Sequence, residues 1–272
     1  RQDISEKKSI FNIRAFIVGK NKGIPVRAFG RIGRSDGYDF FSSMDMNEFG
    51  GKIIESLSNH LSAKKSPAGK LPVVMDNDLT GVFFHEAVGH ACEADCVLEN
   101  SSVLNGMLNK KIAPGKLTLK DSPNVPKEHG YFRYDDEGFP ASDTTVIKNG
   151  ILTSYLHSAE TANRMNLVPT GNGRSESPSV LPIPRMTNTI VKGGKTSKEE
   201  LIKSVKYGIY ALGSSGGVVE PVNGNFLFNA QDAFLIENGE IKHPLKDVSF
   251  GGNILNTLSH VETIGKYSIP SF

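Results

Sequence analysis

The residues best suited to chemistry lie together in one short stretch of the chain. His85 and Glu86 are followed by His90, and the two cysteines of the chain, Cys92 and Cys96, come directly after. A hydrolytic zinc site needs neutral imidazoles as ligands, an open position for water, and a carboxylate that takes the proton of that water. The pattern His-Glu-x-x-His supplies these groups by placing two histidines one helical turn apart. The residue types are therefore those of a zinc hydrolase.

The spacing of the two histidines is one residue longer than in that pattern, because three residues separate Glu86 from His90. On an ideal helix, at about 100° per residue, side chains at positions 85 and 90 point roughly 140° apart and cannot hold one ion. A π-type turn would return them to nearly one face, and Gly89 would ease that distortion. We therefore predict a wide turn from Ala87 to Gly89.

The same residues also have an explanation without metal. On an undistorted helix, Glu86, His90 and Glu93 form one stripe, and an ion pair between Glu86 and His90 would be enough to explain them. The two cysteines would then belong to the core. The spacing alone leaves both interpretations open.

The histidines are expected on a helix that runs from about Leu79 to Leu98, with Asp78 or Thr80 as its N-cap. A short buried strand, Leu71 to Met75, precedes this helix. Residues 64–69 combine charge, proline and glycine, which is typical of a linker.

We place a domain boundary at this linker. Residues 1–66 are expected to be the remainder of an N-terminal α+β domain, and residues 67–272 a β-rich C-terminal domain. In the first part we expect three extended segments and then an amphipathic helix, namely Ile10–Val18, Ile24–Ile32, Asp36–Ser43 and Met46–Ala63.

Strand signals dominate the second part from Thr144 onward. The clearest is a hairpin of residues 144–148 and 151–157 around the turn Asn149-Gly150. Repeated hairpins with few helices favour antiparallel sheets that close or stack to hide their edges. The predicted fold class is α+β, with a mostly antiparallel, barrel-like or sandwich-like C-terminal domain that carries the helix with the histidines.

The composition is that of an ordinary globular protein. Of the 272 residues, 38% are hydrophobic and 22% charged, and the net charge of +2 comes from interspersed acids and bases. No basic field points to nucleic acid, and no apolar run approaches the roughly 20 residues that span a bilayer. Two cysteines do not make a disulfide framework. We expect a protein of the cytoplasm that contacts neither nucleic acid nor membrane.

Six segments share their order and spacing with one known family. They are Phe84–His90, Asp136–Gly138, Asn149–Thr153, Pro169–Arg174, Pro184–Thr189 and Ile236–Gly239. Through them the chain resembles the TldD/PmbA family of metallopeptidases, in its TldD-like, metal-bearing branch. The agreement runs from about Pro67 to the end of the chain. The histidine motif together with the Pro-Arg-Met-Thr-Asn-Thr run is highly specific, whereas a hairpin Asn-Gly is not.

The resemblance implies a zinc-dependent peptidase that acts on unfolded or extended peptides. Carried over to this sequence, His85 and His90 are ligands of Zn²⁺ and Glu86 is the general base. The family pairs a metal-bearing subunit with a paralogue that lacks the motif, so the resemblance also implies a homodimer or heterodimer.

The third metal ligand of the family is a cysteine in a C-terminal segment rich in Cys, Gly and Lys. We expect the sequence, which ends at Phe272, to stop before that segment and to lack the front half of the N-terminal domain of the family. We therefore expect a chain truncated at both ends, with the third ligand outside it. The local alternative is that Cys96 or Glu93 takes its place.

Two loop residues are candidates for substrate contact. Within the resemblance, Asn172 or Arg174 would hold the backbone of a substrate, and the alternative is a tight structural turn. The acids at 135–137 would bind a peptide N-terminus or a second cation, unless they are solvated as most acidic runs are. His129 and His157 are expected to be loop or packing residues.

The competing function is that of a non-catalytic peptide-binding or assembly subunit of a hetero-oligomeric protease. The intact set of His85, Glu86 and His90 argues against it, because a purely structural partner has no need of these residues.

Overall fold

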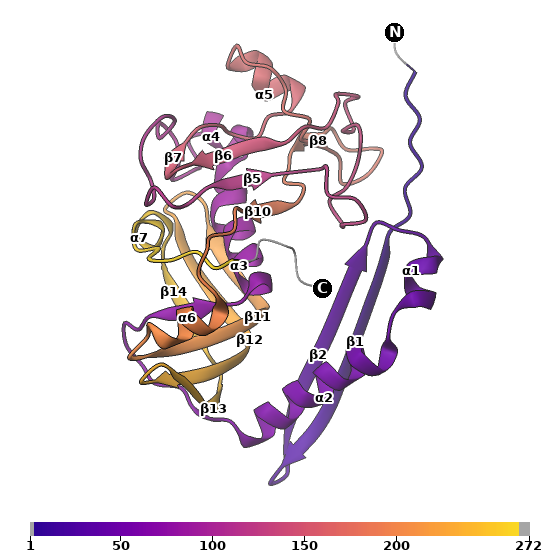
Figure 1. Ribbon diagram of the computed structural model, residues 1–272. Coiled ribbons are helices and arrows are strands. Elements are labelled where there is room, and N and C mark those ends of the chain that lie inside the picture. The colour runs from indigo at the N-terminus through magenta and orange to yellow at the C-terminus, as the bar shows by residue number, and fades with distance from the viewer. Residues whose placement is uncertain (1–2, 267–272) are drawn as a thin grey trace.

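The computed structural model of the chain describes residues 3–266 and has two parts (Figure 1). The first part begins with a long hairpin, in which β1 (Phe11–Asn21) pairs antiparallel with β2 (Ile24–Arg34). Lys22 and Gly23, between the strands, both have positive φ, as in the two-residue turns whose twist matches a hairpin. Because the turn needs only these two residues, β1 continues to Asn21, past its predicted end at Val18, whereas β2 begins at Ile24 as predicted and ends two residues later than predicted, at Arg34.

The predicted amphipathic helix is present as α2 (Met46–Ser62), and it covers one face of the hairpin. It begins at Asp45, whose side chain accepts two backbone N–H groups of the first turn. Phe49 and Ile53 are buried against the hairpin. A Cβ on Gly30 of β2 would lie 2.8 Å from Ile53, so this close approach requires glycine.

The expectation that Asp36–Ser43 is extended is wrong. Residues 38–43 form the short helix α1 (Tyr38–Ser43). The rings of Tyr38 and Phe41 contact each other with centroids 5.6 Å apart. Side chains three residues apart meet in this way on a helix, and here such local contacts outweigh the strand preference of aromatic residues.

The larger sheet of the second part has the order β3-β13-β12-β11-β4, with β14 also paired to β12. Its long strands β11 and β12 are antiparallel, and the short strands β3 and β4 are added in parallel. The bounds are β3 (Lys64–Lys65), β4 (Val73–Met75), β11 (Tyr207–Glu220), β12 (Asn225–Glu237), β13 (Glu240–Lys246) and β14 (Ser249–Asn253). The predicted linker therefore contains a strand, and the division into residues 1–66 and 67–272 stays a prediction.

The smaller sheet has the order β10-β5-β6-β7, and a separate pair joins β8 to β9. The bounds are β5 (Leu119–Asp121), β6 (Thr144–Lys148), β7 (Ile151–Leu152), β8 (Gly173–Arg174), β9 (Ile183–Pro184) and β10 (Thr189–Val191). Three short helices are α5 (Ala159–Arg164), α6 (Lys198–Lys203) and α7 (Ile254–Ser259). The fold is α+β with mostly antiparallel pairing, and over residues 3–266 the sheets stay open rather than closing into a barrel.

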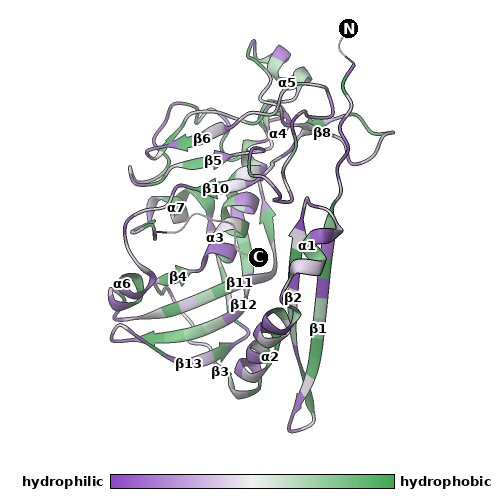
Figure 2. Ribbon diagram, turned by 45° about the vertical axis from the view of Figure 1, so that its right-hand side comes forward, coloured by the Kyte–Doolittle hydropathy of each residue, from purple (hydrophilic) through white to green (hydrophobic). Residues whose placement is uncertain are grey.

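Helix α3 (Asn77–Phe84) lies between the two sheets and leads directly into the histidine stretch (Figures 1 and 2). The ring of Phe83 contacts Phe226 and Phe228 of β12 edge to face. The N-cap is neither Asp78 nor Thr80, because Asp76 accepts the backbone N–H of Leu79 at 2.8 Å. Leu79, Phe83 and Phe84 are all buried, so apolar packing fixes the position of this helix.

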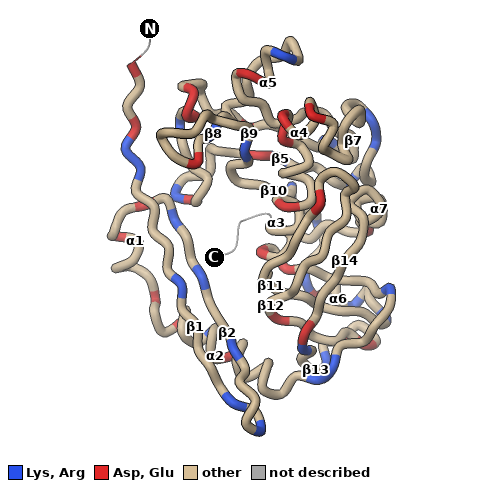
Figure 3. Tube along the Cα trace, turned by 180° about the vertical axis from the view of Figure 1, so that it is seen from behind, with Lys and Arg blue, Asp and Glu red and all other residues tan. Residues whose placement is uncertain are grey.

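Two expectations from the composition can be compared with the structure. Cys92 and Cys96 are both free thiols. Within residues 3–266, no helix is long and apolar enough to cross a membrane. Figure 3 shows acidic and basic residues distributed over both parts of the chain, with several basic residues along β1 and β2.

His60 of α2 joins the hairpin to the larger sheet. Its Nδ1 lies 2.8 Å from the carbonyl oxygen of Arg27, and its Nε2 lies 2.9 Å from that of Gln231. The carboxylate of Asp232 is 3.1 Å from the same Nε2. Because every neighbour is an acceptor, both ring nitrogens must carry a proton. The bond to Asp232 is the largest cause that raises the pKa of His60 to about 9.

This contact predicts that the protein loses stability in mild alkali. The pKa of His60 is higher in the folded chain than the value of about 6.5 expected after unfolding. The contribution of His60 to the free energy of unfolding is therefore complete below about pH 6.5 and is lost as the pH rises through about 9. Allowing for solvent screening of a partly exposed pair, we expect a loss of about 1–2 kcal/mol. Urea unfolding of the wild type and His60→Gln at pH 7 and pH 10 measures it. Equal pH dependence in the two proteins would exclude His60 as the cause.

Candidate metal centre

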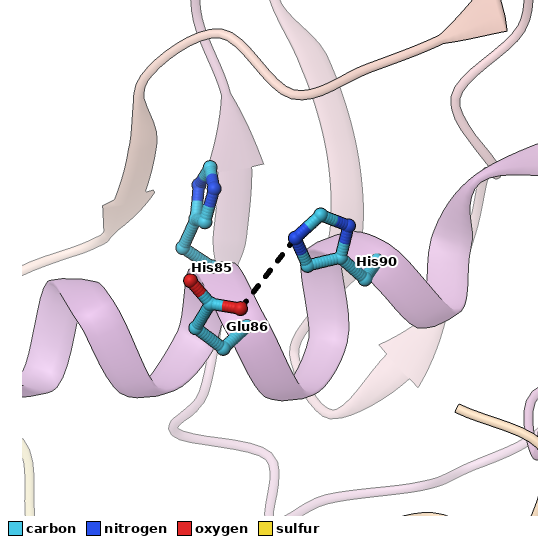
Figure 4. A group of neighbouring side chains, drawn as sticks. All are labelled: His85, Glu86 and His90. Atoms are coloured by element: carbon cyan, nitrogen blue, oxygen red, sulfur yellow. Dashed lines mark ion pairs between the residues drawn. The ribbon is translucent and has the colours of Figure 1, made fainter. Parts of the chain in front are cut away.

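The helix that carries the histidines widens where the sequence predicted it. After α3, η1 (His85–Gly89) is a π-helical turn, and the backbone N–H of His90 bonds to the carbonyl of His85, five residues earlier. The turn brings the two imidazoles to the same side of the helix, with Glu86 beside them (Figure 4). Their ring centroids are 5.5 Å apart. One ligand atom from each of the three residues lies within 4.8 Å of the others.

The expectation of one helix from Leu79 to Leu98 is wrong beyond the histidines. A short 3₁₀ turn, η2 (His90–Cys92), ends at Glu93, which has extended backbone angles, and α4 (Ala94–Leu98) then starts afresh. The reason is a bridge to Leu156: its N–H donates to the carbonyl of Cys92, and its carbonyl accepts the N–H of Ala94. These long-range bonds replace helical ones at the break.

Gly89 allows another segment to lie directly against the π-helical turn. A Cβ at this position would be 2.8 Å from Cγ and 3.1 Å from Sδ of Met186. Met186 is itself 3% exposed. The backbone of Gly89 has ordinary helical angles, φ −56° and ψ −56°, so glycine is needed here for the packing of Met186 rather than for the shape of the turn.

His85 is held in the neutral form. Its Nδ1 lies 3.2 Å from Oγ1 of Thr189, the first residue of β10. Burial, and next the charge of His90, lowers the pKa of His85 to about 4. A histidine must be neutral to bind a metal ion, so His85 requires no deprotonation at neutral pH.

His90 lies between two carboxylates. Its Nδ1 is 3.1 Å from Oε1 of Glu93, and its Nε2 is 3.5 Å from Oε2 of Glu86. The hydrogen bond with Glu93 is the largest cause that raises the pKa of His90. A metal ion would have to compete with a proton at this ring, so its affinity would fall with falling pH.

Glu93 is a buried carboxylate with two partners. It is 3% exposed, and its Oε1 accepts a bond from Nη1 of Arg185 at 2.6 Å as well as the contact with His90. It thus lies on the Nδ1 side of His90, away from Glu86. Cys96 belongs with Glu93 and Asp95 to a second group of donor atoms. The structure therefore does not bring either alternative third ligand into the group of His85, Glu86 and His90.

The residues present fit a zinc ion. Each imidazole has its Nδ1 side occupied by a protein oxygen, which is the arrangement that orients metal-binding histidines and leaves Nε2 for the metal. The side chain of Glu86 is 41% exposed, so solvent reaches its carboxylate. Two imidazoles beside an accessible carboxylate form a donor set typical of hydrolytic zinc sites. Among residues 3–266 this group has no fourth member.

Comparison with known proteins gives the family. Residues 68–269 match the model of the PmbA/TldA metallopeptidase C-terminal domain. The chain belongs to the TldD/PmbA family. A protein of Methanothermobacter thermautotrophicus named metalloprotease is 43% identical over 86% of this chain and 51% of its own length. A protein of Saccharolobus solfataricus named zinc metalloprotease TldD homolog is 31% identical over 97% of this chain and 59% of its own length.

Solved structures have the same fold. A Thermotoga maritima protein described as a candidate modulator of DNA gyrase superposes with a TM-score of 0.81 at 26% identity, over 94% of this chain and 57% of that one. TldE from Thermococcus kodakarensis gives a TM-score of 0.79 at 24% identity, over 94% of this chain and 57% of that one. The chain spans about half the length of the curated relatives it matches.

Asn172 is buried within this TldD/PmbA domain, and its contact with a substrate stays a prediction. It is 1% exposed. Its amide donates to Oδ2 of Asp121 at 2.8 Å and to the carbonyl of Arg185 at 2.9 Å, and its oxygen accepts from Thr170. These bonds give Asn172 a structural role in its loop.

Arg174 remains a candidate for substrate contact. Its Nη1 donates to the carbonyl of Met186, and the guanidinium lies 6.0 Å from the ring of Phe132. It is partly exposed, and its charge is among the causes that lower the pKa of His85. Arg174 therefore lies near the site and brings positive charge to it.

Of the acids at 135–137, only Asp135 is buried, but all three accept backbone N–H groups. Asp135 is 6% exposed and accepts three backbone N–H groups, from Glu137, Phe139 and Gly173. Asp136 accepts the N–H of Ser175, and Glu137 that of Ala159. The three carboxylates hold loops together.

A cavity of about 350 Å³ lies between the hairpin and the start of α3. Its lining includes Arg14, Arg31, Asp78 and His129, and does not include the three residues of the site. The histidines follow the opposite end of α3, so the cavity and the candidate metal centre are distinct. His157, as expected, is a packing residue, at 2% exposed.

Three residues that shape the site were not predicted from the sequence: Asp121, Arg185 and Thr189. Asp121 is 2% exposed and accepts bonds from Thr187 and Asn172. No local pattern distinguishes it from a surface acid, because its partners lie more than 50 residues away along the chain. Arg185 and Thr189 belong to the family-specific Pro-Arg-Met-Thr-Asn-Thr run, and this run was the one sequence signal that could have identified them as site residues.

Proposed function

We propose that this chain carries the catalytic part of a zinc-dependent peptidase that hydrolyses unfolded or extended peptides. The observation that carries the proposal is the π-helical turn, because it places His85, Glu86 and His90 on one side of the helix. A plain ion pair between Glu86 and His90 needs no such distortion. π-turns are rare and occur mostly at functional sites.

His85 and His90 would hold the ion through their Nε2 atoms, since a protein oxygen lies beside each Nδ1. Zinc at this position supplies a Lewis acid that polarises a peptide carbonyl and makes a bound water acidic. Glu86, exposed to solvent beside His90, is the general base that takes the proton of the attacking water and returns it to the leaving amine.

The third ligand is proposed to be a cysteine of a segment that this chain does not include. Two observations support this choice over the local alternatives. Glu93 is already bound to Arg185 and faces Nδ1 of His90, and Cys96 lies in another group of donor atoms. The curated relatives are about twice as long as the stretch they share with this chain.

The edge of the smaller sheet suits an extended substrate. Strand β10 is the end strand of that sheet among the described residues, and its first residue, Thr189, contacts His85. A peptide that paired with this edge would be bound through its backbone, which allows many side chains. Arg174, close to the site, would contact the same backbone.

The second candidate function is a non-catalytic subunit that binds peptides within a protease complex. The fold shared with TldE supports a paralogous partner, which we propose as the second subunit of a dimer. The two functions differ in the need for Glu86, which only the catalytic one requires. A cytoplasmic location stays a prediction.

Hydrolysis of an unfolded protein tests the proposal. A version of the protein as long as its curated relatives, purified with its partner subunit, should degrade casein. It should lose this activity after dialysis against a chelator and regain it when one equivalent of zinc per site is added. A tightly folded protein under the same conditions should stay intact. Hydrolysis that survives complete zinc removal would contradict the proposal.

A further inference from the structure

Residues 185–189 lie across the histidine helix and touch it at three places. Arg185 bonds to Glu93 at 2.6 Å, Met186 packs against Gly89, and Thr189 contacts His85. These residues belong to the Pro-Arg-Met-Thr-Asn-Thr run, to which the proposed reaction assigns no part. Each of the three contacts falls on a site histidine or on a residue beside one.

The contact at His85 is direct. Oγ1 of Thr189 lies 3.2 Å from Nδ1 of that ring. Thr189 has a fixed backbone because it pairs with Asp121 of β5 as the first residue of β10. The neutral imidazole carries one proton on either nitrogen, and the hydrogen bond at Nδ1 decides which. A hydroxyl that accepts from Nδ1–H leaves the lone pair on Nε2.

The contact at His90 passes through one carboxylate. Oε1 of Glu93 lies 3.1 Å from Nδ1 of His90, and Nη1 of Arg185 lies 2.6 Å from the same oxygen. A carboxylate with 3% exposure is costly without a cationic partner, and Arg185 provides one. Arg185 thereby holds the carboxylate of Glu93 turned towards Nδ1 of His90.

The segment that supplies these contacts is itself anchored. The backbone N–H and the hydroxyl of Thr187 both donate to the buried carboxylate of Asp121, at 2.8 and 2.9 Å. The amide of Asn188 donates to the carbonyl of Ser122. Residues held in this way can fix the orientation of a neighbouring ring.

We propose that Thr189 and Arg185 are positioning residues that keep a hydrogen-bonded proton on Nδ1 of both site histidines, Thr189 directly and Arg185 through Glu93, so that Nε2 is the nitrogen left for a metal ion. At His90 the ion would replace the proton that the nearby carboxylate of Glu86 favours on Nε2. Residues 185–189 thus orient both proposed metal ligands, His85 and His90, although these lie on a different segment. The proposal rests on the proposed function, because the choice of nitrogen matters only if the two rings bind a metal ion.

The test is nitrogen NMR of the imidazoles in the metal-free chain, labelled with ¹⁵N-histidine. In the wild type, His85 and His90 should each show a hydrogen-bonded Nδ1–H. Thr189→Val removes the hydroxyl but keeps the shape, and should move the proton of His85 to Nε2 while the signal of His90 stays. Arg185→Met should do the reverse, with loss of the Nδ1–H signal at His90 alone.

The controls separate positioning from general loosening. Thr189→Ser keeps the hydroxyl and should keep the wild-type signal of His85, and Arg185→Lys should restore part of that of His90. Thr153→Val removes an exposed hydroxyl that bonds only backbone carbonyls, and should change neither ring. In the zinc-loaded protein, Thr189→Val and Arg185→Met should each weaken zinc binding about 10-fold to 100-fold.

Two results would overturn the proposal. One is a wild-type His85 protonated at Nε2. The other is a Thr189→Val chain with the wild-type tautomer, and this variant decides the question even if Arg185→Met does not fold. The NMR experiment needs no metal and no substrate, so it tests the positioning of the histidines separately from the proposed function. If the protein shows the predicted protonation at Nδ1 but neither binds zinc nor cuts peptides, the proposed function is wrong and the positioning is not.

Discussion

Replacing Glu86 by glutamine is expected to lower peptide hydrolysis by about 10²-fold to 10⁴-fold, the usual contribution of a general base. The amide has nearly the same shape but cannot take a proton from water. The carboxylate lies 3.5 Å from Nε2 of His90 and is open to solvent, so the change leaves the buried contacts of both histidines intact. The zinc content of the variant should therefore equal that of the wild type.

Glu99→Gln is the matched control for this variant. Glu99 is an exposed acid that follows α4, and its replacement removes the same charge without touching the site. Turnover should be measured with an unfolded protein substrate, and metal by elemental analysis of the same samples. If Glu86→Gln cuts peptides as fast as Glu99→Gln, Glu86 is not the base and the non-catalytic subunit becomes the better account.

Gly89→Ala is expected to destabilise the protein by about 1–3 kcal/mol, as overpacked cores usually do. The new methyl group would lie 2.8 Å from Cγ of Met186, close to the start of that side chain, so Met186 could not avoid it by moving its end alone. Relief requires a shift of the π-helical turn or of residues 185–189. A shift of the turn separates the two histidines, and a shift of residues 185–189 moves Thr189 away from His85 and Arg185 away from Glu93, so zinc binding should weaken in either case.

Gly81→Ala provides a matched comparison on the same helix. A Cβ on Gly81 meets no atom within 4 Å, and its φ is not in the left-handed region. Alanine in a helix interior is favoured over glycine by roughly 0.5–1 kcal/mol, so this variant should gain stability. Urea unfolding measures both. Adding Met186→Ala to Gly89→Ala should recover part of the loss, whereas equal stability of the two glycine variants would contradict the packing argument.

The sequence was sufficient for the features that depend on local spacing. The interval between His85 and His90, with Gly89 between them, predicted the widened turn because an ordinary helix would separate the two rings. The turn Asn149-Gly150 predicted its hairpin, and both residues have positive φ in the structure. The amphipathic pattern after residue 46 likewise predicted α2.

Features that depend on distant partners could not be read from local patterns. The helix breaks at Glu93 because Leu156 bonds to both sides of it. Asp135 would be solvated in most acidic runs, but here three backbone N–H groups surround it. Asn172 was assigned to the substrate on the basis of a loop motif, which gave no sign of its burial among Asp121, Thr170 and Arg185.

The central claim is that His85 and His90 bind the same zinc ion, and anomalous diffraction at the zinc edge tests it most directly. Zinc-loaded crystals of a version of the protein as long as its relatives should show one anomalous peak. This peak should lie about 2.0–2.1 Å from Nε2 of each histidine. The peak should be absent from His90→Ala and present in Glu86→Gln. A zinc-loaded crystal with no peak between the two rings, or with a peak at Glu93, Asp95 and Cys96 instead, would contradict the account.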